Sequence, residues 1–122
     1  MTFAYWCVVI AVFLPLIWVG IAKASASGYD NARPRVWLSQ LDGLAQRANW
    51  AQQNSYETFP PFAAAVIIAH LTQSPQTAVD MLAGIFIVSR VAHGVLYITD
   101  KPTLRSLAWL VGFGATIALF MA

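Results

Sequence analysis

Two groups of polar and ionisable side chains are spaced so that each group can share one face of a helix. The first group lies at intervals of three, four and seven residues near the middle of the chain: Arg47, Trp50, Gln53, Asn54 and Glu57. The second group has the same spacing and comprises Arg90, His93 and Tyr97. Residues three or four apart are neighbours on a helix surface, so each group is predicted to form a polar stripe.

These stripes carry groups that suit a small charged ligand. Arg105 and the adjacent Ser106 add a further guanidinium and a hydroxyl after the second stripe. A guanidinium offers forked donors to a carboxylate, and the carboxylate of Glu57 can accept from an ammonium group. The residues therefore predict a binding site for a small zwitterionic or anionic molecule.

A structural role for the same residues stays open. Glu57 could pair with Arg90 or Arg47 as a link between helices. His93 could be a satisfied core residue, and we expect His70 to be structural or close to the membrane interface. No spacing of cysteine and histidine is typical of a metal site, so no metal is predicted.

The composition indicates that the chain sits in lipid. It has 122 residues, of which 59% are hydrophobic and 10% are charged, and its mean hydropathy is +0.64. Soluble domains carry about 25% charged residues, and small ones bury only about 60–70% of the surface that the unfolded chain exposes. A net charge of +2, without a basic patch, argues against nucleic acid as a partner.

The apolar residues fall into runs long enough to form membrane-spanning helices, which need about 20 residues. The second run is short, so its helix must begin among the polar residues before Glu57. We predict an all-α integral membrane protein with a single domain over residues 1–122, a bundle of four transmembrane helices: Phe3–Ala22, a helix ending at Leu71, Ala78–Ile98 and Ser106–Ala122.

The connections are predicted to be a polar loop, Lys23–Leu38, and two short turns, Thr72–Gln76 and Thr99–Thr103. No positive charge precedes Phe3–Ala22, so we expect a retained helix rather than a cleaved signal peptide. Most of the aromatic residues are expected in interface belts or against lipid: Tyr5, Trp6, Trp18, Trp37 and Trp109.

Lys and Arg residues flank the first and third connections and are missing from the second connection and from both ends. Cytoplasmic loops carry an excess of these residues. We therefore expect a multi-pass protein whose first and third loops are cytoplasmic and whose termini both lie on the opposite side.

Four segments, in this order, resemble the MAPEG family, the membrane-associated proteins in eicosanoid and glutathione metabolism. The stretch Arg47–Pro60 (RANWAQQNSYETFP) is similar to the family signature with its Asn-x-x-Glu element. The other segments resemble a first loop of bacterial members, the third-helix motif and the start of the fourth helix: Tyr29–Asn31 with Pro34 and Arg35, Arg90–Tyr97 (RVAHGVLY), and Arg105 with Ser106.

The resemblance implies a homotrimer of four-helix subunits in a bacterial inner membrane, with glutathione bound between subunits near the cytoplasmic face. It implies catalytic roles near the thiol for Arg105 and Ser106. The glutathione-binding residues that it implies are Lys23, Gln53, Asn54, Glu57, Arg90, His93 and Tyr97. The chain differs from characterised members at Trp50 and Gln53, where arginine is common, and at Trp109, where tyrosine is found.

The function implied is that of a glutathione transferase or peroxidase acting on lipophilic electrophiles or lipid hydroperoxides, with glutathione as cosubstrate. The lipophilic acceptor would enter from the membrane between subunits. One alternative is a non-catalytic trimer that binds lipid or a partner. A small multidrug transporter is disfavoured, because Phe3–Ala22 lacks the intramembrane carboxylate that a transport pathway requires.

Overall fold

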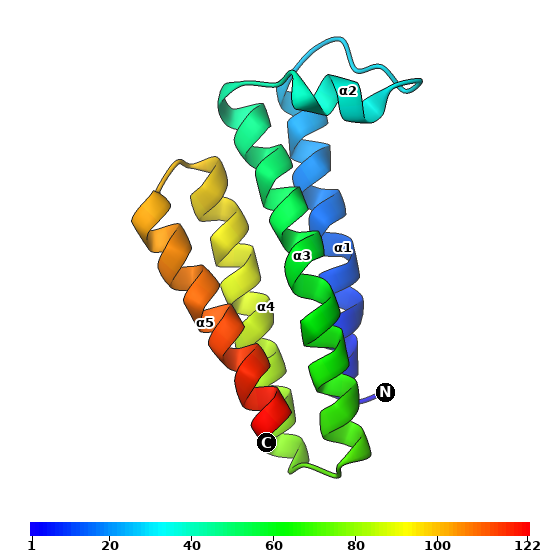
Figure 1. Ribbon diagram of the computed structural model, residues 1–122, viewed down its shortest axis with the longest axis vertical. Helices are drawn as coiled ribbons and strands as arrows, with labels where there is room; N and C mark the ends of the chain where they lie inside the picture. The colour runs from blue at the N-terminus through cyan, green and yellow to red at the C-terminus, as the bar shows by residue number, and fades with distance from the viewer.

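The computed structural model describes residues 1–122 and consists of helices without strands. Figure 1 shows four long helices running side by side, with the short α2 lying across one end and both chain termini at the other. The elements are α1 (Phe3–Ser25), α2 (Pro34–Ser39), α3 (Gly43–Leu71), α4 (Gln76–Ile98) and α5 (Pro102–Met121).

The helical fold class is confirmed, and three of the helices are long and apolar enough to cross a membrane. These are α1, α4 and α5. The longest helix, α3, has 29 residues but begins with a polar half, as the sequence predicted. This polar half contains the first stripe, so the predicted ligand-binding residues of that stripe lie on the least apolar of the four long helices.

The predicted polar loop Lys23–Leu38 is shorter in the structure, for two reasons. Helix α1 continues through Lys23 to Ser25, and part of the loop folds into α2. Pro34 begins α2, where its fixed φ suits the first helical position. The indole Nε1 of Trp37 donates to the Ser27 carbonyl at 3.2 Å, which ties α2 to the end of α1.

Helix α5 also starts earlier than its apolar run indicated. It begins at Pro102 rather than at Ser106, since proline is tolerated in the first turn of a helix. The predicted turn Thr99–Thr103 is correspondingly shorter, and Arg105 lies in the first turns of α5, where its backbone N–H donates to the Lys101 carbonyl at 2.9 Å.

The buried hydrophobic cluster lies mainly in the half of the bundle that holds the chain termini. Phe62 of α3 and Phe86 of α4 stack with ring centroids 3.8 Å apart. Around them are many alanines, which allow helices to approach closely. The buried cluster comprises Ala4, Cys7, Ala11, Phe62, Ala65, Val66, Ala69, Val79, Ala83, Phe86, Ala115 and Leu119.

Hydrogen bonds fix the start of α1 to its neighbours at this end. The Ala4 N–H donates to Asp80 Oδ1 at 2.9 Å. The hydroxyl of Thr2 lies 2.8 Å from His70 Nε2, and the Tyr5 ring stacks on the His70 ring at 3.9 Å. These contacts give His70 a structural role, in line with its interpretation from the sequence.

Trp18 was expected in an interface belt or against lipid, but it is only 4% exposed and lies inside the bundle. Its Nε1 donates to Ser55 Oγ at 3.1 Å, and its ring covers Gly94 so closely that a Cβ at that position would collide with it. Toward the α2 end of the bundle, the α4–α5 pair leans away from the α1–α3 pair (Figure 1). The candidate site lies close to the Trp18 contact, since Ser55 is next to Asn54 in the chain and Gly94 is next to His93.

Candidate functional site

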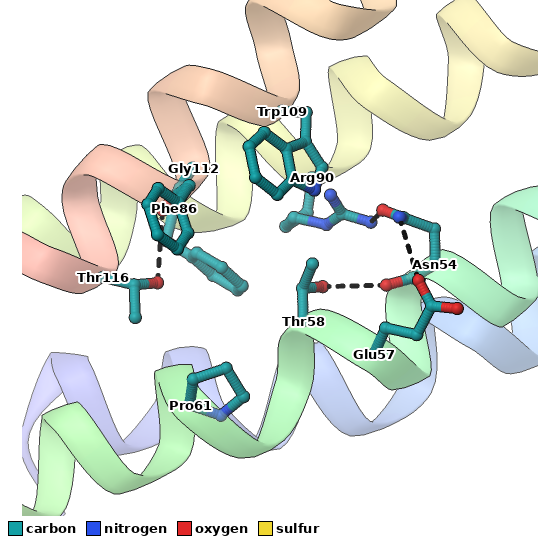
Figure 2. Close-up of a pocket in the computed structure, with 10 residues that line it drawn as sticks. Asn54, Glu57, Thr58, Pro61, Phe86, Arg90, Trp109, Gly112 and Thr116 are labelled. Carbon is teal, nitrogen blue, oxygen red and sulfur yellow. Dashed lines mark hydrogen bonds between the residues drawn. The ribbon is translucent and has the colours of Figure 1, made fainter.

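The two predicted stripes meet through a chain of hydrogen bonds between α3 and α4. Arg90 donates from Nη2 to Asn54 Oδ1 at 2.7 Å, and Asn54 donates from Nδ2 to Glu57 Oε2 at 3.3 Å. This orientation of the amide gives the cation an acceptor and the carboxylate a donor at once. Glu57 and Arg90 are therefore linked not by the direct pair that the sequence left open but by a relay in which Asn54 stands between the charges (Figure 2).

Arg90 is the most unusual side chain in the site, because it is charged and only 2% exposed. Its single hydrogen bond goes to Asn54, while its Nε and Nη1 atoms are buried without a partner. A buried donor without a partner costs roughly 1–3 kcal/mol, and more when it is charged. Sites that keep such a group are candidates for ligand binding.

The second stripe continues into a stack of three side chains near the start of α5. The guanidinium carbon of Arg105 lies 4.3 Å from the centroid of the Tyr97 ring. His93, only 3% exposed, meets the same ring edge-on at 5.6 Å. Cation–π contacts of this kind hold a guanidinium in place while leaving its N–H groups free to donate.

These side chains border a cavity of about 390 Å³ between α3, α4 and α5. Its lining includes His93 and Tyr97 of the second stripe and Asn54 of the first stripe. The two predicted catalytic residues, Arg105 and Ser106, line it as well. The lining is Asn54, His93, Tyr97, Arg105, Ser106, Trp109 and Leu110. The cavity, here called the Arg105 cavity, therefore offers cationic, hydroxyl and amide groups to one ligand.

A second, shallower hollow of about 260 Å³ lies on the outer side of α3. Trp50, Gln53 and Glu57 line it, together with Asn54 and Tyr97. Trp50 and Tyr97 lie with their ring centroids 6.2 Å apart. Asn54 thus borders both this hollow and the Arg105 cavity, which places the whole Asn-x-x-Glu element at one continuous polar surface.

Lys23 and Arg47 lie apart from this surface. Lys23 is exposed at the end of α1, where its Nζ sits 4.3 Å above the Tyr29 ring. Arg47 donates from Nε to the Ile98 carbonyl at 3.1 Å and so stabilises the end of α4, a favourable place for a cation. Within one chain, Lys23 is therefore not brought to the other predicted ligand-binding residues.

A third cavity, of about 180 Å³, lies deeper between α3, α4 and α5 and was not predicted. Figure 2 shows the Asn54–Arg90 hydrogen bond at one end and Phe86, Thr116 and Pro61 at the other. Its lining is Asn54, Glu57, Thr58, Pro61, Phe86, Arg90, Trp109, Gly112, Phe113 and Thr116. We call it the Arg90 cavity.

The residues that sequence reasoning missed are Thr58, Trp109 and Thr116. Thr58 follows Asn54 by four residues, so the stripe could have been extended to it, and its hydroxyl donates to the Asn54 carbonyl at 3.1 Å. Trp109 lines both the Arg105 cavity and the Arg90 cavity. From the sequence it was interpreted as an aromatic at the interface or against lipid, and as the counterpart of a family tyrosine, but it was not included among the predicted site residues.

Comparison with known families gives a match over nearly the whole chain. The model described as the MAPEG family matches residues 3–122. No curated protein matches the chain.

Proposed function

Because the chain belongs to the MAPEG family over residues 3–122, we propose that this membrane protein is a glutathione-dependent transferase or peroxidase acting on lipophilic electrophiles or lipid hydroperoxides. The observation that carries the proposal is the pair of guanidinium groups, Arg90 and Arg105, in adjacent cavities that share Asn54. Glutathione carries two carboxylates, an ammonium group and a thiol, and these are the groups that Arg, Glu and Asn side chains recognise.

In this proposal Asn54 and Glu57 hold the amino and backbone polar groups of the tripeptide. Arg90, His93 and Tyr97 line its pocket from α4, with Gln53 and Lys23 as further binding residues. Gln53 lines the outer hollow next to Asn54. Lys23 is far from the other residues within one chain, so its contribution requires a neighbouring subunit.

Arg105 and Ser106 face the thiol. Only the thiolate form of the sulfur attacks, and a free thiol has a pKa near 8.5. A guanidinium within hydrogen-bond reach favours the anion and lowers that pKa. The thiolate then forms a carbon–sulfur bond with the electrophile, whose leaving group or opened ring oxygen takes the electron pair and a proton. With a hydroperoxide, two thiols supply two electrons and give an alcohol, water and a disulfide.

The proposed assembly is a homotrimer in which α3 also spans the membrane, as a fourth helix. The support is the outer face of α3, on which Trp50, Gln53, Tyr56 and Glu57 are exposed in the single chain. Amide and carboxylate groups cannot face lipid cheaply, so a second copy of the chain covers this face. Native mass spectrometry in mild detergent tests the assembly, since a stable monomer or dimer contradicts it.

The proposed location is a bacterial inner membrane with the α2 end in the cytoplasm. Of the seven Lys and Arg residues, only Arg90 lies away from that end, and the rest are in the first and third connections or next to them. An excess of these residues marks cytoplasmic loops. Cysteine-accessibility labelling of the α2 loop and of the chain ends, which we place on the opposite side, tests the topology.

Calorimetry of the purified protein with glutathione tests the proposal most simply. Glu57→Gln removes the carboxylate charge but keeps the shape, and we expect it to weaken glutathione binding by about 1.5–3 kcal/mol, the range for hydrogen bonds to charged groups. Gln46→Glu, which changes charge by one unit elsewhere on α3, is the control. Binding that is unchanged in Glu57→Gln, with a lower melting temperature, would favour the non-catalytic alternative.

A further inference from the structure

A hollow of about 480 Å³ lies between the first half of α3 and α2, which crosses this end of the bundle (Figure 1). Asn49, Gln52 and Tyr56 line it from α3. Arg35 and Ser39 line it from α2, and no carboxylate borders it. The hollow, here called the Arg35 hollow, therefore combines one cation with amide and hydroxyl groups, a set that suits a carboxylate ligand.

Arg35 is placed at this hollow by a helix that is itself held firmly. Two residues further along α2, Trp37 is buried, and its indole Nε1 donates to the Ser27 carbonyl at 3.2 Å. The Tyr29 ring packs edge-on against the Trp37 ring at 5.2 Å. The Arg35 side chain is exposed, and its guanidinium has no hydrogen bond or ion pair within the single chain. All of its donors are therefore available to a ligand.

The surface proposed for glutathione needs a further cation. Asn54 and Glu57 are assigned to the amino end of the tripeptide, where the ammonium group and one carboxylate share a carbon atom. The glycine carboxylate lies at the other end of a three-residue chain, up to about 10 Å away. Arg105 is assigned to the thiol, and Arg90 already donates to Asn54. No cation lines the outer hollow, whose residues are Trp50, Gln53, Asn54, Glu57 and Tyr97.

The Arg35 hollow and the outer hollow lie at opposite edges of the exposed face of α3, and both include Gln53. Trp50 and Glu57, seven residues apart, mark one edge, while Asn49 and Tyr56, also seven apart, mark the other. In a ring of three copies the interface is heterologous, so one edge of each subunit meets the other edge of the next. In the proposed trimer the Arg35 hollow of one subunit therefore faces the outer hollow of its neighbour.

We propose that the Arg35 hollow of each subunit completes the glutathione site of the next, and that Arg35 binds the glycine carboxylate of the tripeptide. The inference rests on the proposed function and on the proposed trimer. It supplies a cation to a site in which Trp50 and Gln53 stand where arginine is common in characterised members. Arg35 takes no part in forming the bond to the acceptor: it makes the site selective for thiols that carry this carboxylate.

A pair of nearly isosteric ligands tests the contact in the wild-type protein. Glutathione amide has a carboxamide in place of the glycine carboxylate and is otherwise identical to glutathione. Calorimetry in mild detergent should show that glutathione binds at least about tenfold more tightly than the amide, because a hydrogen-bonded ion pair is lost. Equal affinities for the two ligands would overturn the inference without any need for a variant.

Arg35→Gln tests whether the preference for the carboxylate comes from Arg35. The variant should bind glutathione at least about tenfold more weakly than the wild type does, and its affinities for glutathione and the amide should agree within about threefold. Arg33→Gln removes the same charge just outside the hollow and should behave like the wild type. An undiminished preference for glutathione in a folded Arg35→Gln variant would overturn the assignment.

Mixed trimers show whether Arg35 acts on its own subunit or on the next one. Subunits with Arg35→Gln and subunits with Glu57→Gln are co-expressed with different tags, and trimers that hold both are isolated through the two tags. If the site lies between subunits, every mixed trimer has one interface at which an intact Glu57 faces an intact Arg35. Glutathione should bind there with the wild-type affinity. Mixed trimers without such a site would place both residues in one subunit and overturn the inference.

Glutathione calorimetry on the wild type separates this inference from the proposed function. A wild-type protein that binds no glutathione removes both. A wild-type protein that binds glutathione, with an affinity that Arg35→Gln leaves unchanged, removes the inference alone and keeps the proposed function.

Discussion

The guanidinium of Arg105 lies 4.3 Å above the centre of the Tyr97 ring, which fixes a cation from α5 against the stripe on α4. The aromatic face, rather than the hydroxyl, makes this contact. Tyr97→Phe should therefore keep glutathione affinity within about threefold, while Tyr97→Leu should lose about 0.5–2 kcal/mol of binding free energy as Arg105 becomes mobile. Calorimetry on both variants measures the difference, and a larger loss in Tyr97→Phe would mean that the hydroxyl itself binds the ligand.

Asn54 is expected to matter for stability as well as for binding, because it gives Arg90 its one hydrogen bond. Asn54→Ala should lower the free energy of unfolding by about 1.5–3 kcal/mol, since it leaves a buried cation without a partner. Gln46→Ala, on the same helix but away from the cavities that Asn54 lines, is the control and should change stability little. Thermal melts of the two variants in the same detergent give the comparison, and equal melting temperatures would show that Arg90 finds another partner.

The contact between Trp18 and Gly94 should determine how closely α1 approaches α4. A Cβ at residue 94 would collide with the Trp18 ring, whereas a Cβ at Gly114 meets no atom within 4 Å. Gly94→Ala should therefore cost about 1–3 kcal/mol through overpacking, and Gly114→Ala should be neutral or stabilising. Melts of both alanine variants test this directly. The account of this interface fails if the two substitutions behave alike.

Much of the site could be predicted from the sequence because helical spacing is a local property. The residues at positions 47 to 57 and 90 to 97 lie three and four apart, and the fold brings Asn54 and Arg90 into contact through those faces. The sequence left open a direct ion pair of Glu57 with Arg90, and the structure has a relay through Asn54 instead, since the choice between a pair and a relay depends on how far apart two helices sit. Periodicity does not encode that distance.

The burial of Trp18 and the Arg90 cavity could not be predicted for a related reason. The residues next to Trp18 in the sequence are typical of an interface aromatic. Its burial depends on two residues of other helices: Gly94, which has no side chain in the way of the ring, and Ser55, whose hydroxyl accepts the indole hydrogen bond. The cavity arises where Trp109, Phe86 and Pro61 from three helices fail to fill the space between them. Pro34 and Pro102 were assigned to a loop and a turn, whereas in the structure they begin α2 and α5.

The central claim is that Arg105 stabilises the thiolate of bound glutathione, and titration of the thiolate ultraviolet absorbance against pH tests it most directly. We predict that the wild-type protein lowers the pKa of the bound thiol by about two units from its free value near 8.5, which corresponds to about 2.7 kcal/mol. A thiol with a lowered pKa is ionised at neutral pH, and this advantage disappears as the pH falls through the lowered value. Arg105→Ala should return the titration toward that of free glutathione, and Arg105→Lys should recover only part of the shift, because lysine lacks the planar fork. Titration curves that coincide for wild type and Arg105→Ala, at saturating glutathione, would contradict the claim and leave Arg105 as a structural partner of Tyr97.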